Sequence, residues 1–527
     1  MKRILETYPV ISVMLLMFLC LAPVMAMRDF SPANELRYLS IADEALRDGH
    51  VFAFTNHGLA YADKPPLYFW IIMLCRLLFG RHCMFVLSLF SFIPAMVMIG
   101  VMDSWMCGSK GLFEDRFSAG ERAGAALLLG SSGLFLGMSV FLRMDMLMCM
   151  WIVLALKAFS DDRPGLFALY TFLALFTKGP VGILAPLLSV LVYLLVSRRG
   201  REMGRWFGWK TWAILATGCL IWFSGVYIDG GKEYLDNLLV HQTVGRAVNS
   251  FHHKAPWWFY FTTIWEVLAP WCLAVVPAVV VSFFRPGRGN DESVWAWTAA
   301  VTFVMLSLFS SKIAIYLAPI FPFAAYIYPM VARRSGYAGW MKAAFFTASL
   351  LLALVGLVLS VAGAFFGPLS GVLALHGIDV SAYAFAGGPL TVLGGLAILV
   401  GGALGCMGAL KAWHKAVIPS SVGLLVGVFF ASWMMPSIND FVGYRNLCKA
   451  VPEATDVYSW QVYRPENVDV YLGHEITVLD KETPMEAVLE TLPSDAVLMT
   501  KASLFPEGLE GRKSVVSGDY AVFLPLE

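Results

Sequence analysis

The chain has 527 residues, of which 58% are apolar and only 14% are charged, with a formal net charge of +1. Soluble domains are on average about half apolar and a quarter charged, so this composition excludes an ordinary water-soluble protein. The small net charge gives no indication of a nucleic-acid partner, and the nine cysteines form neither CxxC pairs nor a metal-ligand pattern.

The first apolar run, residues 9–27, follows Lys2 and Arg3. It is long enough to cross a bilayer, which takes about 20 largely apolar residues. A small-residue motif ending at Ala26 resembles a signal-peptide cleavage site, so removal of this run is the alternative. The run is long for a signal peptide and further spans follow, which favours an uncleaved helix. In either case we expect Arg28 and the residues after it to lie outside the cytoplasm.

Residues 28–82 are expected to form the first outer loop, with two helices at the membrane interface. Segment 34–48 has charged and apolar side chains on opposite sides at helical spacing, which predicts an amphipathic helix. The apolar run 66–80 is short for a span, and counting it as one would invert the orientation of every later segment. We therefore expect this run to lie along the membrane surface.

The basic residues between the later apolar runs orient them, because cytoplasmic loops are enriched in lysine and arginine. With the N-terminus inside, the basic clusters at 110–122, 198–210, 285–288, 333–334 and 411–415 all fall in the cytoplasm. The sequence therefore predicts an all-α polytopic membrane protein with about 13 transmembrane helices. The predicted spans are 9–27, 83–106, 122–141, 145–160, 165–177, 179–196, 211–228, 257–283, 293–311, 313–331, 341–363, 386–410 and 416–435.

The composition becomes polar near residue 436, and no further span follows. Residues 484–492 have helical spacing. We expect a transmembrane unit, residues 1–435, and a small extracytoplasmic α/β domain, residues 436–527. Strand-like runs in this domain lie at 456–462, 468–472, 476–479, 496–500 and 520–524.

Charged residues recur at the predicted outer ends of helices, in turns too short to be passive linkers. Arg143 and Asp145 lie between two spans, and Lys178 and Lys312 occupy two other tight turns. Each one alone could be a helix-end charge that reaches toward the interface. Together they favour a site for a phosphate-bearing substrate, because lysine and arginine bind phosphate and a carboxylate can orient or deprotonate an acceptor.

Several motifs resemble those of the superfamily that contains the lipid A aminoarabinose transferases and the protein O-mannosyltransferases. The more specific one begins at Tyr61 and contains Asp63-Lys64-Pro65-Pro66. The resemblance covers roughly residues 1–335. Its other elements are Asn34-Glu35-Leu36-Arg37-Tyr38, Arg143-Met144-Asp145, Thr177-Lys178-Gly179-Pro180, the segment from Gly245-Arg246 to His253, and Ser311-Lys312 with Tyr316.

The resemblance implies a GT-C fold and a glycosyltransferase that moves a sugar, with inversion, from a polyprenyl-phosphate donor to an envelope acceptor. The reaction would take place at the outer face of the bacterial inner membrane. A lipid A-like glycolipid is the favoured acceptor, and protein hydroxyls or a polysaccharide are the alternative. Polyprenyl phosphate is the leaving group, so no cofactor is required. The expected partners are the donor, a lipid, glycan or protein acceptor, and membrane lipids.

By the same resemblance, the candidate catalytic residues are Glu35, Asp145, Lys64 and Asn34. The family's first-loop motif opens with Asp-Glu, whereas this chain has Asn34 in the first place. The base is then Glu35 or Asp145, or the acceptor is a phosphate that needs no base. The residues expected to bind the substrates are Arg37, Tyr38, Tyr61, Arg143, Lys178, Arg246, Lys312 and Tyr316.

Two further alternatives remain open. Asp63, together with His252 or His253, could bind a divalent metal, although so few ligands do not define a metal site. A transporter or flippase for a lipid-linked saccharide is the alternative from another class of protein. It would be expected to have internal repeats and charged or broken helices near the bilayer midplane. This chain shows no internal repeat and keeps its ionisable groups at one face.

Overall fold

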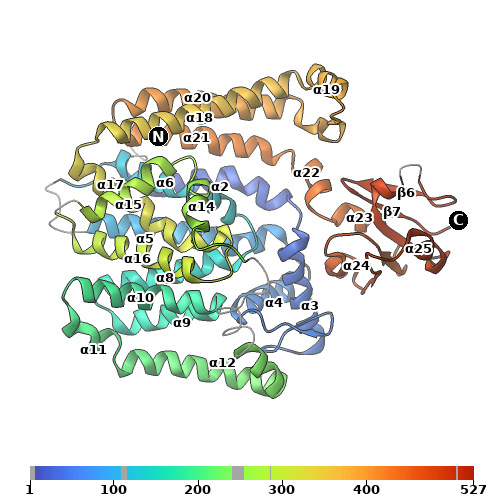
Figure 1. The fold of residues 1–527 in the computed structure, drawn as a ribbon, viewed down its shortest axis with the longest axis horizontal. Coiled ribbons are helices and arrows are strands. Elements are labelled where there is room, and N and C mark those ends of the chain that lie inside the picture. The colour runs from blue at the N-terminus through green and yellow to red at the C-terminus, as the bar shows by residue number, and fades with distance from the viewer. Residues whose placement is uncertain (1–5, 109–114, 240–253, 285–286, 506–507, 527) are drawn as a thin grey trace.

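The computed structural model describes residues 6–108, 115–239, 254–284, 287–505 and 508–526. Most of its helices lie side by side in one bundle, and a small domain with a sheet lies beyond one end of it (Figure 1). We call this end of the bundle the domain end. Seven helices of the described chain are long and apolar enough to cross a membrane. They are α2 (Pro9–Met27), α5 (Met84–Gly108), α12 (Trp209–Asp236) within the helical segment Gly200–Leu239, η4 with α17 (Ala314–Ser335), α18 (Gly339–Ala364), α20 (Pro389–Ala409) and α21 (Trp413–Ser432).

Helices occupy all the predicted spans. Three of those spans contain two consecutive helices each: α6 (Ala119–Gly130) with α7 (Gly133–Met138), α14 (Phe259–Val267) with α15 (Cys272–Phe284), and η4 (Ala314–Ile320) with α17 (Phe321–Ser335). Pro270 lies between α14 and α15, where its missing N–H interrupts the helical hydrogen bonds. The described chain thus supports a multi-pass helical fold, while the number thirteen stays a prediction. The remaining helices at predicted spans are α8 (Met144–Ser160), α9 (Pro164–Lys178), α10 (Pro180–Val196) and α16 (Asn290–Leu308).

Basic clusters from distant loops meet at the end of the bundle away from the sheet domain, where Figure 1 places α11 (Met203–Trp206). Arg333 pairs with Glu121 at 3.1 Å, and Arg205 pairs with Asp162 at 2.5 Å. These contacts join Arg333 to α6 and Arg205 to the turn after α8, while the gathering of all five clusters on one side stays a prediction. Their assignment to the cytoplasm remains a prediction.

The two helices predicted for the first loop are present. They are α3 (Arg37–Asp48), preceded by the short helix η1 (Pro32–Leu36), and α4 (Leu67–Phe79). A hairpin of β1 (Thr55–Asn56) and β2 (Leu59–Ala60) lies between them. The charge pattern placed Glu44 of α3 on a solvated side, but its side chain is buried. Its carboxylate accepts hydrogen bonds from the hairpin, including the backbone N–H groups of His57 and Gly58, so it fixes the hairpin on α3.

The sheet domain has five strands in the order β4-β3-β5-β7-β6. Strand β3 is parallel to β4 and β5, whereas β7 is antiparallel to β5 and β6. The predicted helix at 484–492 is confirmed as α25 (Met485–Thr491). The strands are β3 (Val457–Ser459), β4 (Thr477–Val478), β5 (Val497–Lys501), β6 (Ser514–Ser517) and β7 (Tyr520–Phe523).

The strand predicted at 468–472 is wrong, because this segment forms η6 (Pro465–Val468) and the short helix α24 (Asp469–Leu472). The Asp469 carboxylate accepts from the backbone N–H of Val470 and from the hydroxyl of Ser40 in α3. Gly473 then ends the helix with a φ of 76°, a conformation that favours glycine. A local apolar pattern could not foresee the contact with α3.

The buried carboxylate of Asp29 connects the sheet domain to the bundle. It accepts hydrogen bonds from the backbone N–H of Arg445 at 2.9 Å and from the Tyr471 hydroxyl at 2.5 Å. The Arg445 guanidinium also lies 3.4 Å from it. Asn439 binds both sides of the same turn, accepting from the N–H of Asp29 and donating to the carbonyl of Met27. These contacts fix α22 (Met435–Val442) and α23 (Arg445–Lys449) against the end of α2.

We predict that Asp29→Ala weakens the attachment of the sheet domain. Hydrogen bonds to a charged group contribute about 1.5–3 kcal/mol each, so the loss of two or more should lower the melting temperature clearly. Thermal unfolding and limited proteolysis of the detergent-purified chain measure the effect, and Asp48→Ala, at an exposed position, is the control. Equal melting temperatures and equal protease resistance of the two variants would contradict this attachment.

Candidate functional site

Asp145 is the centre of a charged cluster at the domain end of the bundle. It lies in the first turn of α8, is only 2% exposed, and accepts a hydrogen bond from the Lys178 ammonium. The Arg143 guanidinium lies 3.4 Å from its other oxygen. An acid at a helix N-terminus and a lysine at a helix C-terminus both interact favourably with the helix dipoles. The helix ends and the two cations together allow a buried carboxylate to remain ionised.

The turn between α9 and α10 positions Lys178 for this contact. Gly179 has a φ of 96°, which side chains rarely tolerate, and Pro180 starts α10 with a fixed backbone angle. The two helices therefore reverse direction within one residue. Lys178 is held at the end of α9, and its side chain points to α8 instead of into solvent.

The first loop and η4 contribute further residues to this cluster. The Lys178 ammonium lies 4.8 Å from the centre of the Tyr316 ring in η4. The charge of Lys64 acts on the Asp145 carboxylate. Burial raises the pKa of the Tyr38 phenol, and that hydroxyl also experiences the charges of Arg143, Asp145, Arg37 and Lys178. Segments that are far apart in the sequence thus meet at one place. We call Tyr38, Lys64, Arg143, Asp145, Lys178 and Tyr316 the Asp145 cluster.

Arg37 extends this site along the first loop. Its guanidinium lies over the rings of Tyr61 and Tyr38, at 5.6 and 6.0 Å from their centres. It also donates to the side-chain oxygen of Asn34 at 3.0 Å. Asn34 therefore orients Arg37 and brings no negative charge to the site.

Glu35 has a structural position. Its carboxylate binds both terminal nitrogens of Arg28, at 2.7 and 2.6 Å. It also accepts from the backbone N–H groups of Ser31 and Leu142. The side chains of Arg28 and Glu35 are 5% and 2% exposed. A carboxylate that is buried and bound to four protein donors is poorly placed to take a proton from a substrate, but it ties the first loop to the segment that enters α8.

Lys312 lies beside the cluster but points to backbone carbonyls. Its ammonium donates to the carbonyl of Ala255 at 3.1 Å and to that of Phe309. Burial lowers the pKa of this lysine. It holds the segment before α14 against the segment before η4, next to Tyr316.

The metal hypothesis remains a prediction. Asp63 is half-buried, while His252, His253 and also Arg246 lie outside the described residues. Among the side chains that the structure does describe, no three His, Cys, Asp or Glu residues gather as a metal site would require.

Sequence reasoning missed residues that hold the first loop in place. Asp229 of α12 accepts hydrogen bonds from the backbone N–H groups of Val51, Phe52 and Ala53. The Tyr234 hydroxyl, further along α12, accepts from the backbone N–H of Phe54, just before the hairpin, and donates to the carbonyl of Tyr61, just after it. An isolated acid near the end of an apolar helix was the only available signal, and its backbone partners lie more than 170 positions away.

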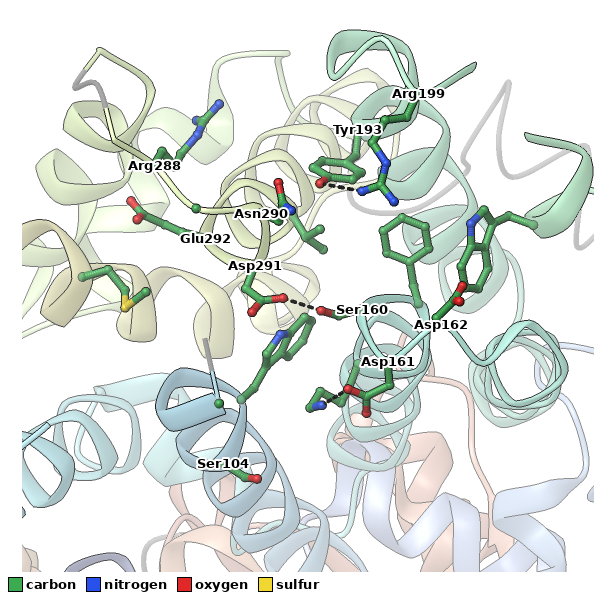
Figure 2. Close-up of a pocket in the computed structure, with 18 residues that line it drawn as sticks. Ser104, Ser160, Asp161, Asp162, Tyr193, Arg199, Arg288, Asn290, Asp291 and Glu292 are labelled. Atoms are coloured by element: carbon green, nitrogen blue, oxygen red, sulfur yellow. Dashed lines mark hydrogen bonds and ion pairs between the residues drawn. The ribbon is translucent and has the colours of Figure 1, made fainter. Parts of the chain in front are cut away.

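A second set of charged side chains surrounds a cavity of about 700 Å³ among the basic clusters at the far end of the bundle (Figure 2). It shares no residue with the Asp145 cluster. Its acids already have protein partners: Asp161 binds Lys157, Asp291 binds Ser160, and Glu292 binds Arg334. The acids of this cavity thus bind side chains of the same end of the bundle.

No family model matches the chain. Among curated proteins, the chain is similar to an undecaprenyl phosphate-alpha-4-amino-4-deoxy-L-arabinose arabinosyl transferase of Pseudomonas fluorescens. The two are 27% identical over 301 residues, and the matched region covers 54% of this chain and 51% of that protein. A transferase of the same name from Pseudomonas aeruginosa is 26% identical over 300 residues, 54% of this chain and 52% of that protein. The chain thus spans about half the length of the curated relatives it matches.

Among solved structures, the chain has the fold of ArnT from Cupriavidus metallidurans bound to undecaprenyl phosphate. The TM-score is 0.73 at 17% identity, over 98% of this chain and 97% of that one. The apo structure of the same protein gives a TM-score of 0.72. The resemblance inferred from the motifs is confirmed, and so is the fold that it implied.

We predict that Glu35→Gln destabilises the protein. Removing the charge leaves the buried Arg28 without its ion-pair partner, at a cost of about 3 kcal/mol. The melting temperature in detergent should fall well below that of Glu490→Gln, which changes an exposed glutamate in α25. An unchanged melting temperature would argue that the Glu35 carboxylate is not a structural group.

Proposed function

We propose that this chain is an integral-membrane glycosyltransferase that moves a sugar from a polyprenyl-phosphate donor to a lipid A-like acceptor. The observation that carries the proposal is the Asp145 cluster, in which Lys178 and Arg143 contact one buried carboxylate at the domain end and the charge of Lys64 also acts on it. The fold of a protein solved with undecaprenyl phosphate and the similarity to named arabinosyl transferases support it.

The cations of the cluster would bind the donor phosphate. Lysine and arginine neutralise phosphate oxygens, and charge-assisted hydrogen bonds of this kind are strong. During transfer, the acceptor oxygen forms a bond to the anomeric carbon while the bond from that carbon to the phosphate oxygen breaks. The departing polyprenyl phosphate keeps the electron pair. Lys64 and Lys178 would stabilise the negative charge that develops there.

The state of the three candidate bases favours a phosphate acceptor. Asn34 carries no charge, and its side-chain oxygen accepts a hydrogen bond from Arg37. The Glu35 carboxylate accepts hydrogen bonds from four protein donors. Asp145 is paired with Lys178 and Arg143. A hydroxyl acceptor has to lose a proton, whereas an ionised phosphate is a ready nucleophile. We therefore favour a phosphate of a lipid A-like glycolipid over protein hydroxyls or a polysaccharide. In this mechanism Asp145 is a positioning residue that aims Lys178 and Arg143.

The finer topology is part of the proposal. We place the thirteen spans in the inner membrane, with the Asp145 cluster and the 436–527 domain on the periplasmic side. The basic clusters at the opposite end of the bundle support this orientation, since cytoplasmic loops collect lysine and arginine. Residues 1–435 would carry the catalytic machinery.

We predict that Lys64→Ala and Asp145→Asn each reduce sugar transfer by about a hundredfold or more, because misplaced charge at the reacting centre costs factors of this size. The assay uses purified chain in detergent, an undecaprenyl-phosphate aminoarabinose donor and lipid A. Lys481→Ala, at an exposed position of the sheet domain, is the matched control and should keep wild-type turnover.

The two substitutions should differ in their kinetics. Lys64→Ala should raise KM for the donor, because a phosphate contact is lost. Asp145→Asn should lower kcat without removing a limb of the pH–rate profile, because a positioning residue does not exchange the proton. Wild-type turnover in both variants would eliminate the Asp145 cluster as the site, and loss of a pH limb would make Asp145 the base.

We predict that an impermeant thiol reagent labels Glu490→Cys in intact spheroplasts but not Arg201→Cys. Both positions are exposed, and the proposal places them on opposite sides of the membrane. The parent for both should have its exposed native Cys107 replaced. The reverse labelling pattern would invert the topology and exclude a periplasmic site.

A further inference from the structure

A second pocket lies at the domain end, between the bundle and the sheet domain, with a volume of about 660 Å³. It shares no residue with the Asp145 cluster. Three segments form its wall: the end of α2, the turn from α4 to α5, and the α23–α24 region of the sheet domain. None of these lining residues has a role in the proposed transfer.

The charge of the lining is one-sided. Arg76, Arg81, Arg445 and Lys449 all line the pocket, and its lining contains no Asp or Glu. Two acids outside the lining compensate part of this charge. Asp43 lies 3.1 Å from Arg76 and 2.9 Å from His82, and Asp29 lies 3.4 Å from Arg445.

Arg81 and Lys449 account for the remaining positive charge. Both are exposed, and neither has a hydrogen-bond or ion-pair partner among the described residues. His82 adds a further polar group, since its side chain is only 6% exposed while its Nδ1 atom has no hydrogen-bond partner in the described chain. A pocket that gathers cations without lining carboxylates is suited to an anion.

Exposed apolar side chains lie on α2 and α4, two helices that lead into this pocket. Ala26 of α2 and Phe85 of α5 belong to the lining. Ile11, Leu15 and Leu19 of α2 are all more than half exposed, and their spacing of four residues puts them along one side of the helix. On α4, the apolar residues Leu74, Leu77, Leu78 and Phe79 are exposed just before the turn that carries Arg81.

We propose that this pocket binds the phosphate-bearing headgroup of an anionic lipid. Arg81 and Lys449 would contact phosphate oxygens, while the acyl chains would lie along the exposed apolar side chains of α2 and α4. Charge-assisted hydrogen bonds from arginine and lysine to phosphate oxygens are strong. Since α4–α5 supplies Arg81 and α23 supplies Lys449, the lipid would bridge the bundle and the sheet domain. The inference does not depend on the proposed transferase activity.

The test measures binding of phosphatidylglycerol to the purified full-length chain in detergent, with phosphatidylcholine as the uncharged comparison lipid. Loss of one charge-assisted hydrogen bond lowers an affinity by about tenfold. The double variant Arg81→Ala/Lys449→Ala should therefore bind phosphatidylglycerol at least about tenfold more weakly than the wild type. The control, Lys481→Ala/Lys501→Ala, removes the same charge from exposed positions outside the pocket and should bind like the wild type.

Two further measurements separate a lipid site from an unfolded variant and from a site for free phosphate. The swap Arg81→Lys/Lys449→Arg keeps the charge and should retain binding, which distinguishes loss of the site from loss of the fold. Inorganic phosphate should displace phosphatidylglycerol only weakly, because it lacks the acyl contacts. The proposal is overturned if the double alanine variant binds phosphatidylglycerol like the control, if phosphatidylcholine binds equally well, or if inorganic phosphate alone binds as tightly as the lipid.

Discussion

A carboxylate buried at the end of a helix bundle has to be neutralised by its neighbours, and this requirement organises the domain end of the protein. Asp145 meets it with Lys178 and Arg143, and with its place in the first turn of α8. The Gly179-Pro180 turn supplies Lys178 from the adjacent helix. A phosphate that entered this cluster would compete with Asp145 for the same cations, so the resting ion pairs also prepare a binding site.

Other acidic side chains at this end accept hydrogen bonds from backbone N–H groups. Glu35 ties the first loop to the segment before α8, Glu44 fixes the hairpin, and Asp229 binds three successive backbone N–H groups. Asp29 then attaches the sheet domain. A loop of more than fifty residues is thereby held rigidly beside α8 and α9, which is what a site assembled from distant segments requires.

Hydropathy located the helices well, because a long apolar run in a membrane has to satisfy its backbone hydrogen bonds within a helix. The same patterns failed where long-range contacts decide. Segment 468–472 contains the short helix α24, whose first residue, Asp469, binds Ser40 of α3. Glu35 is a catalytic candidate by the resemblance, and the fold adds a partner that the motif does not show, the backbone N–H of Leu142, 107 positions away in the sequence. Within the site, the tight turns at Arg143–Asp145 and Lys178 were visible in the sequence, whereas the pairing of Arg37 with Asn34 and Tyr61 depends on the fold of the first loop.

If the Asp145 cluster transfers a sugar onto an envelope lipid, as we propose, the composition of the envelope depends on this chain. Mass spectrometry of envelope lipids and glycans from cells that lack this chain tests this proposal most directly, with complementation by the wild type or by Asp145→Asn. We expect one lipid A-like species to lose a sugar in the deletion strain, to regain it with the wild type, and not to regain it with Asp145→Asn. Identical lipid and glycan profiles in all strains, or full restoration by Asp145→Asn, would contradict it.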